Sequence, residues 1–146
     1  MLRFLRTLFG GARPGDPGAA GEREAADWLR RERGFELVAR NWRSPRDRRD
    51  ELDLVCRDGE VLVFVEVKAR SAKALVPGYY AVDARKKAAV RRAAKVYLAG
   101  LTRRPTTFRF DVVEVSTGDE AGAAERPATE ILHFENVPLF EKHFRG

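Results

Sequence analysis

The stretch from Glu51 to Lys68 constrains the fold more than any other part of this chain, because it has the pattern of a tight β-hairpin. Two runs rich in apolar and β-branched residues flank the dipeptide Asp58-Gly59. Asp-Gly between such runs is a strong signal for a two-residue hairpin loop. The second run, Val61–Val67, is apolar at nearly every position. A strand of that composition is typically central in a sheet and covered on both faces.

Acidic residues gather at the open end of this hairpin. With Asp58-Gly59 as the loop, Glu51 faces Glu66 across the strands, and Asp53 lies one diagonal step from Glu66. Because side chains alternate along a strand and cross-strand partners share a face, these carboxylates and Lys68 are predicted to lie on one side of the sheet. Opposed like charges destabilise a sheet, and half-buried carboxylates are costly unless they are paired or bound to metal. We therefore favour a divalent-metal site over the alternative, an edge hairpin with solvated charges paired to Lys68.

The overall composition fits one domain with a polyanionic partner. The chain has 146 residues and a net charge of +6, and Ala84–Arg104 holds eight Lys or Arg and no acid. A basic balance of this kind favours nucleic acid as a partner. The single cysteine, Cys56, excludes an internal disulfide and a Cys-based metal cluster, and it fits a reducing cytoplasm.

The N-terminal part is expected to lie outside the folded domain. Met1–Phe9 is short and interrupted by two arginines, which argues against a signal peptide or a spanning helix. It could be a frayed tail or a brief basic amphipathic helix that touches a partner or a membrane. Gly10–Gly21 is rich in Gly, Pro and Ala and is typical of a flexible linker. We expect a flexible segment over residues 1–20, one domain over 21–137 and a C-terminal tail over 138–146.

The remaining elements follow from apolar periodicity and turn residues. A helix is expected from Glu22, with Ala25, Ala26 and Leu29 inward, and it ends at Gly34. Asp83 is a credible N-cap for a second helix that runs to about Ala99. The other expected segments are a strand over Phe35–Asn41, a polar loop over Ser44–Asp50, a loop over Ala69–Val82, and strands over Thr107–Val115 and Thr129–Phe134.

This order predicts an α/β domain with a mixed central sheet flanked by helices. Because the connections are short, successive elements should be neighbours. Tracing the chain back from the open end of the hairpin brings Glu22 and Lys86, each in the first turn of its helix, to that same end. Glu22, Glu51, Asp53, Glu66, Lys68 and Lys86 are thus predicted to converge from four elements.

The predicted site suits a hard divalent cation. Carboxylate ligands with no His or Cys nearby favour Mg²⁺ or Mn²⁺ over zinc, and His133 and His143 are not expected to be ligands. Asp53 and Glu66 would hold the ion, with the backbone carbonyl of Val67 as a third ligand. A bound metal would polarise a phosphate oxygen and lower the pKa of bound water. Lys68 would orient the attacking water or neutralise developing charge.

Basic residues around the hairpin and on the second helix are candidates for contacts with phosphates. On the second helix, Arg85, Arg92 and Lys95 are predicted to lie on the side away from Val90 and Tyr97, with no acid expected to pair with them; the alternative is a solvated face. Lys86 instead extends the inward stripe at the first turn of this helix. The predicted nucleic-acid-binding residues are Arg43, Arg46, Arg48, Arg49, Arg70, Arg85, Lys86, Arg92 and Lys95.

Asp53 followed by Glu66-Val67-Lys68 resembles the D…(D/E)-x-K motif of the restriction-endonuclease-like nuclease superfamily, and the element order is similar to its αβββαβ core. More narrowly, the chain resembles the YraN-like family of small bacterial proteins, relatives of archaeal Holliday junction resolvases. The pieces that carry this resemblance span residues 21 to 137: Gly21-Glu22, Arg40-Asn41-Trp42-Arg43, Glu51-Leu52-Asp53-Leu54, Val63-Phe64-Val65-Glu66-Val67-Lys68-Ala69-Arg70, Lys86, Arg109-Phe110-Asp111-Val112-Val113, His133 and Asn136.

The resemblance implies an active site of Glu22, Asp53, Glu66 and Lys68, with Glu51 as a further metal-site member. It implies a Mg²⁺- or Mn²⁺-dependent endonuclease acting on DNA, with branched or junction DNA as one substrate class. Asp50 departs from the family pattern, which usually has Gly there. The alternatives are a non-catalytic nucleic-acid-binding module that keeps the metal pocket and an interaction protein that works through its basic helix and tail. The sequence also leaves a homodimer open.

Overall fold

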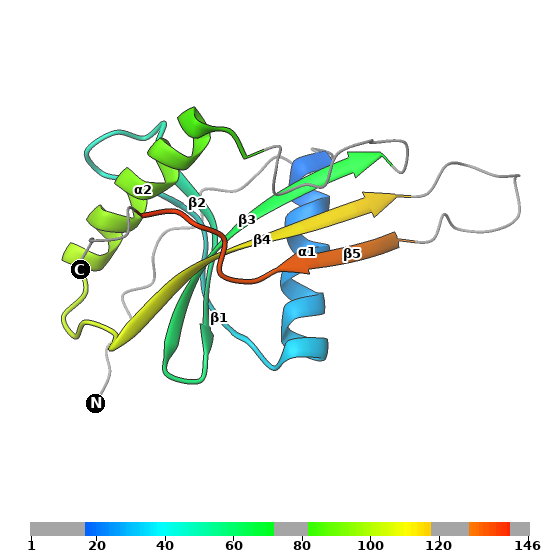
Figure 1. The fold of residues 1–146 in the computed structure, drawn as a ribbon, viewed down its shortest axis with the longest axis horizontal. Coiled ribbons are helices and arrows are strands. Elements are labelled where there is room, and N and C mark those ends of the chain that lie inside the picture. The colour runs from blue at the N-terminus through cyan, green and yellow to red at the C-terminus, as the bar shows by residue number, and fades with distance from the viewer. Residues whose placement is uncertain (1–16, 72–81, 118–128, 141–146) are drawn as a thin grey trace, which may run out of the picture.

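In the computed structural model of the chain, residues 17–71, 82–117 and 129–140 are described. These segments form two helices and five strands in the order αβββαββ (Figure 1). The elements are α1 (Pro17–Arg33), β1 (Glu36–Arg43), β2 (Glu51–Asp58), β3 (Val61–Ser71), α2 (Ala84–Ala99), β4 (Thr107–Thr117) and β5 (Thr129–Phe134).

The five strands form one mixed sheet in the order β1-β2-β3-β4-β5. Strands β3 and β4 are parallel, and the other neighbours are antiparallel. Parallel neighbours need a crossover, and α2 supplies it between β3 and β4. The predicted α/β class, mixed sheet and order of elements are confirmed.

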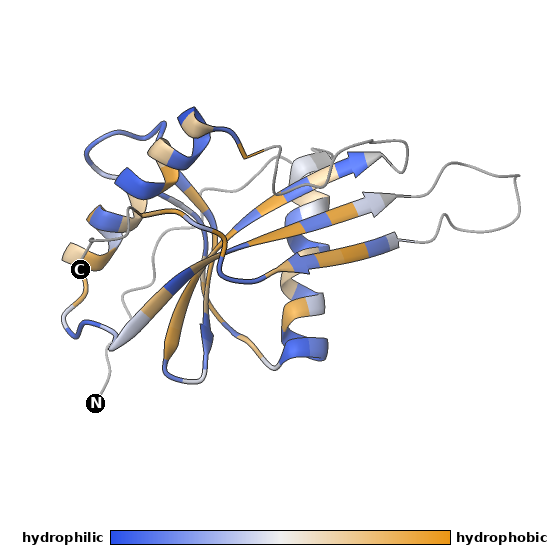
Figure 2. Cartoon of the chain, viewed as in Figure 1, coloured by the Kyte–Doolittle hydropathy of each residue, from blue (hydrophilic) through white to orange (hydrophobic). Residues whose placement is uncertain are grey.

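The sheet has a hydrophobic core on each face. Along β3, Val63 and Val65 pack in the cluster that contains Ala25 and Leu29 of α1. Phe64, between them in sequence, packs in the cluster that contains residues of α2. This alternation places the helices on opposite faces of a strand that is apolar along most of its length (Figure 2). β3 is therefore central and covered on both faces, as its composition predicts.

The predicted hairpin is present, but its loop lies one residue further along than expected. Asp58 pairs with Val61, so the loop residues are Gly59 and Glu60. Gly59 has φ 58°, and a positive φ at the first of two loop residues is the feature that type II′ hairpins require of Gly. The predicted register is therefore wrong by two residues. A shift of two leaves every side chain on its predicted face, because the period of a strand is two.

The helix boundaries match the sequence at three ends and differ at one. α1 begins at Pro17, five residues before Glu22, so residues 17–21 are helical where a linker was expected. Proline is well suited to a first helical position, since its missing N–H would have no partner there. Glu22 consequently lies in the second turn of α1. Asp83 caps α2 as predicted, and its side chain accepts a hydrogen bond from the Lys86 backbone N–H at 2.8 Å.

Two strands, β3 and β4, extend further along the chain than the sequence indicated. β3 continues to Ser71 and β4 to Thr117, because the two strands pair in parallel along their whole length. The expected loop from Ala69 therefore starts later, and residues 72–81 of it lie outside the described part. No helix in the described ranges is long and apolar enough to cross a membrane.

A fully buried carboxylate on β4 connects this strand to β5, the last strand of the sheet. Asp111 of β4 is 0% exposed and accepts hydrogen bonds from Arg109 and from the backbone N–H of Asn136 at 2.9 Å each. His133 Nε2 of β5 lies 2.8 Å from the other carboxylate oxygen. Arg109 also donates to Asp58 at the hairpin turn, at 3.0 Å. We call these five residues the Asp111 cluster.

Candidate metal and active site

Two buried carboxylates lie at the end of the sheet where the β2–β3 ladder stops. The last paired residues there are Leu54 and Val65. Immediately beyond them, Asp53 of β2 is 7% exposed and Glu66 of β3 is 3% exposed. Asp53 Oδ2 accepts a hydrogen bond of 2.9 Å from the backbone N–H of Val67. The corrected register makes Asp53 the residue opposite Glu66, where a diagonal neighbour was predicted.

Two lysines from different elements approach the same oxygen of Glu66. Lys68 Nζ and Lys86 Nζ each lie 3.5 Å from Glu66 Oε1. Burial raises the pKa of the Glu66 carboxyl well above its usual range, and the charge of Asp53 raises it further, while the two lysines oppose the shift. Burial alone would lower the pKa of Lys86, but the carboxylates of Glu66, Asp53 and Glu51 outweigh it and the pKa is raised. The residues predicted to share one face of the hairpin therefore do meet.

Glu22 joins the site from α1. The preceding residue, Gly21, is buried, and a Cβ there would lie 3.2 Å from the Cβ of Ala69 on β3, so the absence of a side chain lets the helix lie close to the strand. Burial and the charge of Asp53 raise the pKa of Glu22 to about 7. A hydrogen bond from the Asn41 side chain opposes the shift. Because Glu22 lies in the second turn, a role as a first-turn helix charge does not explain its position.

Asn41 and Arg40 are neighbours of Glu22 that the sequence analysis did not assign to the site. Asn41 has φ 49° within β1, a left-handed conformation that is uncommon for a non-glycine residue inside a strand. Arg40 lowers the pKa of Glu22 through its charge. Its Nε is the one buried side-chain polar atom without a hydrogen-bond partner among the described residues. The sequence signals were the piece Arg40-Asn41-Trp42-Arg43 in the family resemblance and the Asn itself, which tolerates this conformation better than most residues.

Glu51 belongs to the rim of this site. Its carboxylate lies 3.3 Å from Arg43, and its side chain is 32% exposed. Among the described residues, no group of three or more His, Cys, Asp or Glu side chains has an arrangement that could hold a metal ion. Asp53 and Glu66 are two buried carboxylates at this end of the sheet.

This pair fits Mg²⁺ or Mn²⁺. Both side chains offer hard oxygens, and burial together with the charge of Asp53 raises the pKa of Glu66, so a cation between the two would favour its charged form. Mg²⁺ is usually bound through one or two carboxylates, with water and substrate phosphates completing its coordination. Val67, whose carbonyl was predicted as a metal ligand, donates its backbone N–H to Asp53 and so orients that side chain.

The predicted phosphate-binding residues fall into two groups. Arg43, Arg49, Arg70, Lys86 and Arg92 lie within 4 Å of a carboxylate; their partners are Glu51, Asp47, Glu114, Glu66 and Asp50. Arg46, Arg48, Arg85 and Lys95 are exposed. The expectation that no acid pairs with the outward face of α2 is therefore wrong at Arg92.

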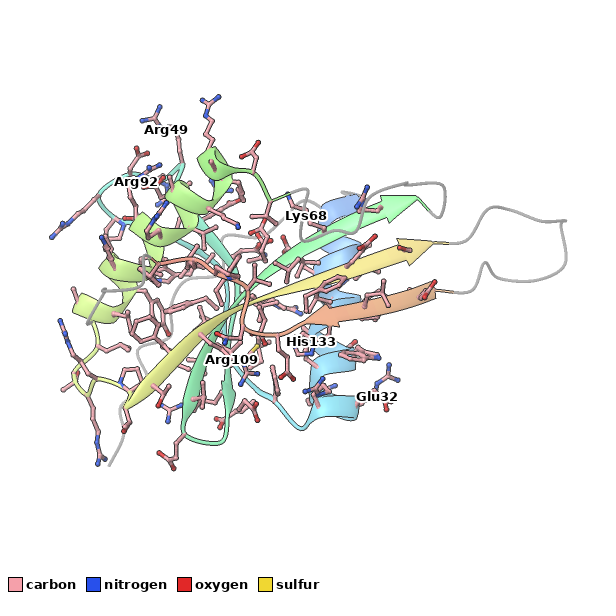
Figure 3. The ribbon with its side chains drawn as sticks, viewed as in Figure 1. Glu32, Arg49, Lys68, Arg92, Arg109 and His133 are labelled. Carbon is pink, nitrogen blue, oxygen red and sulfur yellow. The ribbon has the colours of Figure 1, made fainter. Side chains whose placement is uncertain are left out.

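The pair Asp50–Arg92 fixes the arginine-rich loop on α2. Arg92, which is labelled on α2 in Figure 3, donates hydrogen bonds of 2.9 and 3.0 Å to the carboxylate of Asp50. Asp50 itself is 6% exposed. The loop is closed by a bond from the Ser44 backbone N–H to the Asp50 carbonyl oxygen, at 2.9 Å. Asp50, the departure from the family pattern, is an anchor for the loop.

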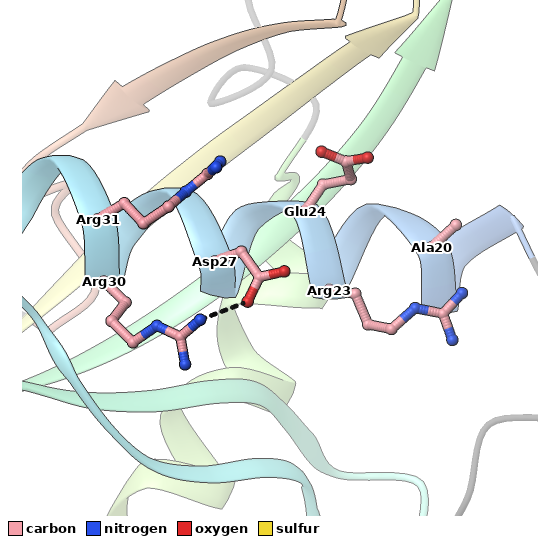
Figure 4. Close-up of a pocket in the computed structure, with 6 residues that line it drawn as sticks. All are labelled: Ala20, Arg23, Glu24, Asp27, Arg30 and Arg31. Carbon is pink, nitrogen blue, oxygen red and sulfur yellow. Dashed lines mark hydrogen bonds and ion pairs between the residues drawn. The ribbon is translucent and has the colours of Figure 1, made fainter.

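The outer face of α1 carries a shallow polar hollow away from these carboxylates. It is lined by Ala20, Arg23, Glu24, Asp27, Arg30 and Arg31 (Figure 4). Arg30 lies 3.3 Å from Asp27, and both side chains are mostly exposed. A surface ion pair of this kind contributes little, so this face offers no comparable site.

The chain can be placed by comparison with known proteins. The model of the uncharacterised protein family UPF0102 matches residues 21–115. A UPF0102 protein of Beutenbergia cavernae is 50% identical over 107 residues, which cover 73% of this chain and 86% of that relative. A UPF0102 protein of Bordetella avium is 41% identical over 133 residues, which cover 88% of each chain. The chain therefore belongs to the uncharacterised protein family UPF0102, the YraN-like family that its sequence resembles.

Proposed function

We propose that this protein is a Mg²⁺- or Mn²⁺-dependent nuclease that hydrolyses phosphodiester bonds in DNA. The observation that carries the proposal is the pair Asp53 and Glu66, two buried carboxylates side by side with two lysines on one of them. A stable fold gains nothing from burying like charges together. The resemblance of Asp53 and Glu66-Val67-Lys68 to a nuclease motif supports the same reading.

In this proposal Asp53 and Glu66 hold the metal, and Glu22 adds a further carboxyl group to the same pocket. A bound Mg²⁺ supplies polarisation of a phosphate oxygen and lowers the pKa of its water. The Val67 N–H fixes one oxygen of Asp53 and so orients this ligand. The proposed role of Lys68 is to donate to the attacking water or to a phosphate oxygen, and it is supported by a side chain that is 28% exposed and lies 3.5 Å from Glu66.

DNA as the substrate is supported by charge. The net charge is +6, and the loop Ser44–Asp50 directly precedes the start of β2, where Asp53 lies. The Asp50–Arg92 bonds hold this loop in place, and Arg46 and Arg48 stand exposed on it. Contacts from such arginines to phosphates position a nucleic acid without reading its sequence. We propose the cleavage of branched or junction DNA as the activity to test first.

The test is cleavage of branched, flapped and linear DNA with Mg²⁺ or Mn²⁺. Asp53→Asn and Glu66→Gln are expected to lose at least about three orders of magnitude in rate, since a catalytic metal contributes several kcal/mol. Both variants should keep the far-ultraviolet circular dichroism of the wild type. Wild-type protein that binds DNA but cuts none of these substrates would favour the non-catalytic binding module instead.

A further inference from the structure

Lys86, the second lysine beside Glu66, is not one of the residues of the nuclease-like motif formed by Asp53 and Glu66-Val67-Lys68. Lys68 belongs to the Glu-x-Lys pattern on β3, whereas Lys86 comes from α2 on a face of the sheet. Even so, both ammonium groups lie at the same distance, 3.5 Å, from one oxygen of Glu66. One carboxylate oxygen thus carries two cationic neighbours.

The start of α2 holds Lys86 in this position. The Lys86 backbone N–H donates to the Asp83 side chain at 2.8 Å, and the Lys87 backbone N–H donates to the Asp83 carbonyl oxygen at 2.9 Å. This capped first turn aims Lys86 at Glu66 and leaves 31% of its side chain exposed. Lys87, the next residue, forms no ion pair within the described part of the chain. The contact is therefore specific to one of two adjacent lysines.

We propose that Lys86 is a positioning residue that serves as an internal counter-ion: it neutralises Glu66 while no metal is bound, and metal binding releases it toward the substrate phosphate. This inference rests on the proposed metal site. It differs from the assignment of Lys86 as a plain phosphate contact, because it makes Lys86 and the metal competitors for one carboxylate.

Electrostatics gives the reason for the competition. A divalent cation between Asp53 and Glu66 would lie within a few ångströms of two ammonium groups, and like charges at that distance repel strongly in a partly buried site. Lys68 belongs to the Glu-x-Lys pattern, and in the proposed nuclease it stays beside the metal to act on the attacking water or a phosphate oxygen. Lys86 reaches the site on a flexible four-carbon stem from a separate element, so it can leave without any movement of the strand. In this proposal Lys86 is therefore the cation that moves away from Glu66 when a metal ion binds.

The experiment measures metal binding and metal-free stability in parallel for Lys86→Met and the matched control Lys87→Met. In EDTA, Lys86→Met should melt a few degrees lower than wild type, because Glu66 loses one of its two cations. Its dissociation constant for Mn²⁺, measured by calorimetry without DNA, should be about 5- to 10-fold lower, within the usual range for coupled sites. Lys87→Met should change neither quantity.

Two further variants at Lys86 distinguish a charge effect from a folding defect. Lys86→Arg keeps the positive charge and should bind Mn²⁺ no more tightly than wild type, whereas Lys86→Gln should follow Lys86→Met. Unchanged or weaker Mn²⁺ binding by Lys86→Met and Lys86→Gln, with normal binding by wild type, would overturn this inference alone. Wild-type protein that binds no Mn²⁺ would overturn the proposed metal site together with it.

Discussion

Two groups of buried acids in the described part of this protein, the Asp111 cluster and the pair Asp53 and Glu66, differ in how their charges are compensated. In the Asp111 cluster, both carboxylate oxygens of Asp111 are hydrogen-bonded, to Arg109, His133 and Asn136. Around Asp53 and Glu66, two acids face each other at close range, and Glu22 adds a third carboxyl group nearby. Figure 3 shows Arg109 and His133 beside each other and Lys68 toward another part of the sheet.

The pKa values of the two clusters shift in opposite directions. Burial alone would raise the pKa of Asp111, but His133, Arg109 and the Asn136 N–H outweigh it and the pKa is lowered. At Glu66 burial and Asp53 together raise the pKa despite the two lysines. A buried acid with a complete set of partners is part of the scaffold. A buried acid whose partners are incomplete is a candidate for binding a cation, and such perturbed groups gather at functional sites.

The largest expected difference is in stability. Asp111→Asn should cost about 3 to 5 kcal/mol of unfolding free energy, because it leaves Arg109 poorly paired in a buried site. The matched variant Asp58→Asn removes a carboxylate that is 40% exposed from the same Arg109, and it should cost less than about 1 kcal/mol. Urea denaturation measures both. Equal losses for the two variants would mean that Asp111 is not the centre of its cluster.

At the proposed metal site, removing an acid is expected to raise the unfolding free energy of the metal-free protein, the opposite of the effect at Asp111. Glu66→Gln should stabilise the metal-free protein at neutral pH, since burial and the charge of Asp53 raise the pKa of Glu66 and so disfavour its charged form in the fold. In wild type, Mg²⁺ should raise the unfolding free energy by about 2.7 kcal/mol at 100 times its dissociation constant. Glu66→Gln should abolish this gain, and Asp58→Asn should retain it. The measurement compares melting temperatures in Mg²⁺ and in EDTA. A wild-type melting temperature that does not change with Mg²⁺ would indicate that these acids have only a structural role.

The pH dependence of stability should also separate the two clusters. Glu22 has a folded pKa of about 7 against its ordinary value of 4.5, so the folded state holds this proton longer. Its contribution is fully present below about pH 4.5 and is lost as the pH rises to about 7. The lowered pKa of Asp111 has the reverse effect, and that stability is lost in acid.

The variant Glu22→Gln should therefore flatten the fall in metal-free stability between pH 5 and 7.5. Glu24→Gln, two residues along on the exposed side of α1, is the control and should leave the slope unchanged. Denaturation series across this pH range give the slopes. A slope that Glu22→Gln leaves as steep as in wild type would assign the proton uptake to another group.

The smallest expected effect concerns the salt dependence of DNA binding. Replacing Arg46 and Arg48 with Gln should lower the slope of log affinity against log salt by about 1.8, at about 0.9 for each phosphate contact on duplex DNA. The control replaces Arg103 and Arg104, which follow the far end of α2 and carry the same charge. It should leave the slope unchanged. An equal loss in both variants would indicate a general charge effect and not a surface at the metal site.

The sequence by itself determined the elements, their order and which acids share a face. Alternation along a strand is a local property with a period of two, so Asp53, Glu66 and Lys68 met even though the predicted register was wrong by two residues. The cap at Asp83 and the end of α1 before Gly34 were likewise local signals. Gly59 was correctly predicted to lie in the loop, but whether it is the first or the second loop residue could not be decided from sequence, because Asp-Gly fits two positions of a tight turn.

Only the tertiary structure decided which charges became partners. From sequence, Arg92 was expected to be an unpaired cation on the outward face of its helix, but in the fold it is hydrogen-bonded to Asp50. The Asp111 cluster likewise joins residues from separate strands. Lys86 and Lys87 are identical in type and adjacent in sequence, yet only the former lies against Glu66. Long, flexible side chains can reach many positions. Their partners are set by how elements pack and by which acids lose water on burial, and no local pattern in the sequence contains that information.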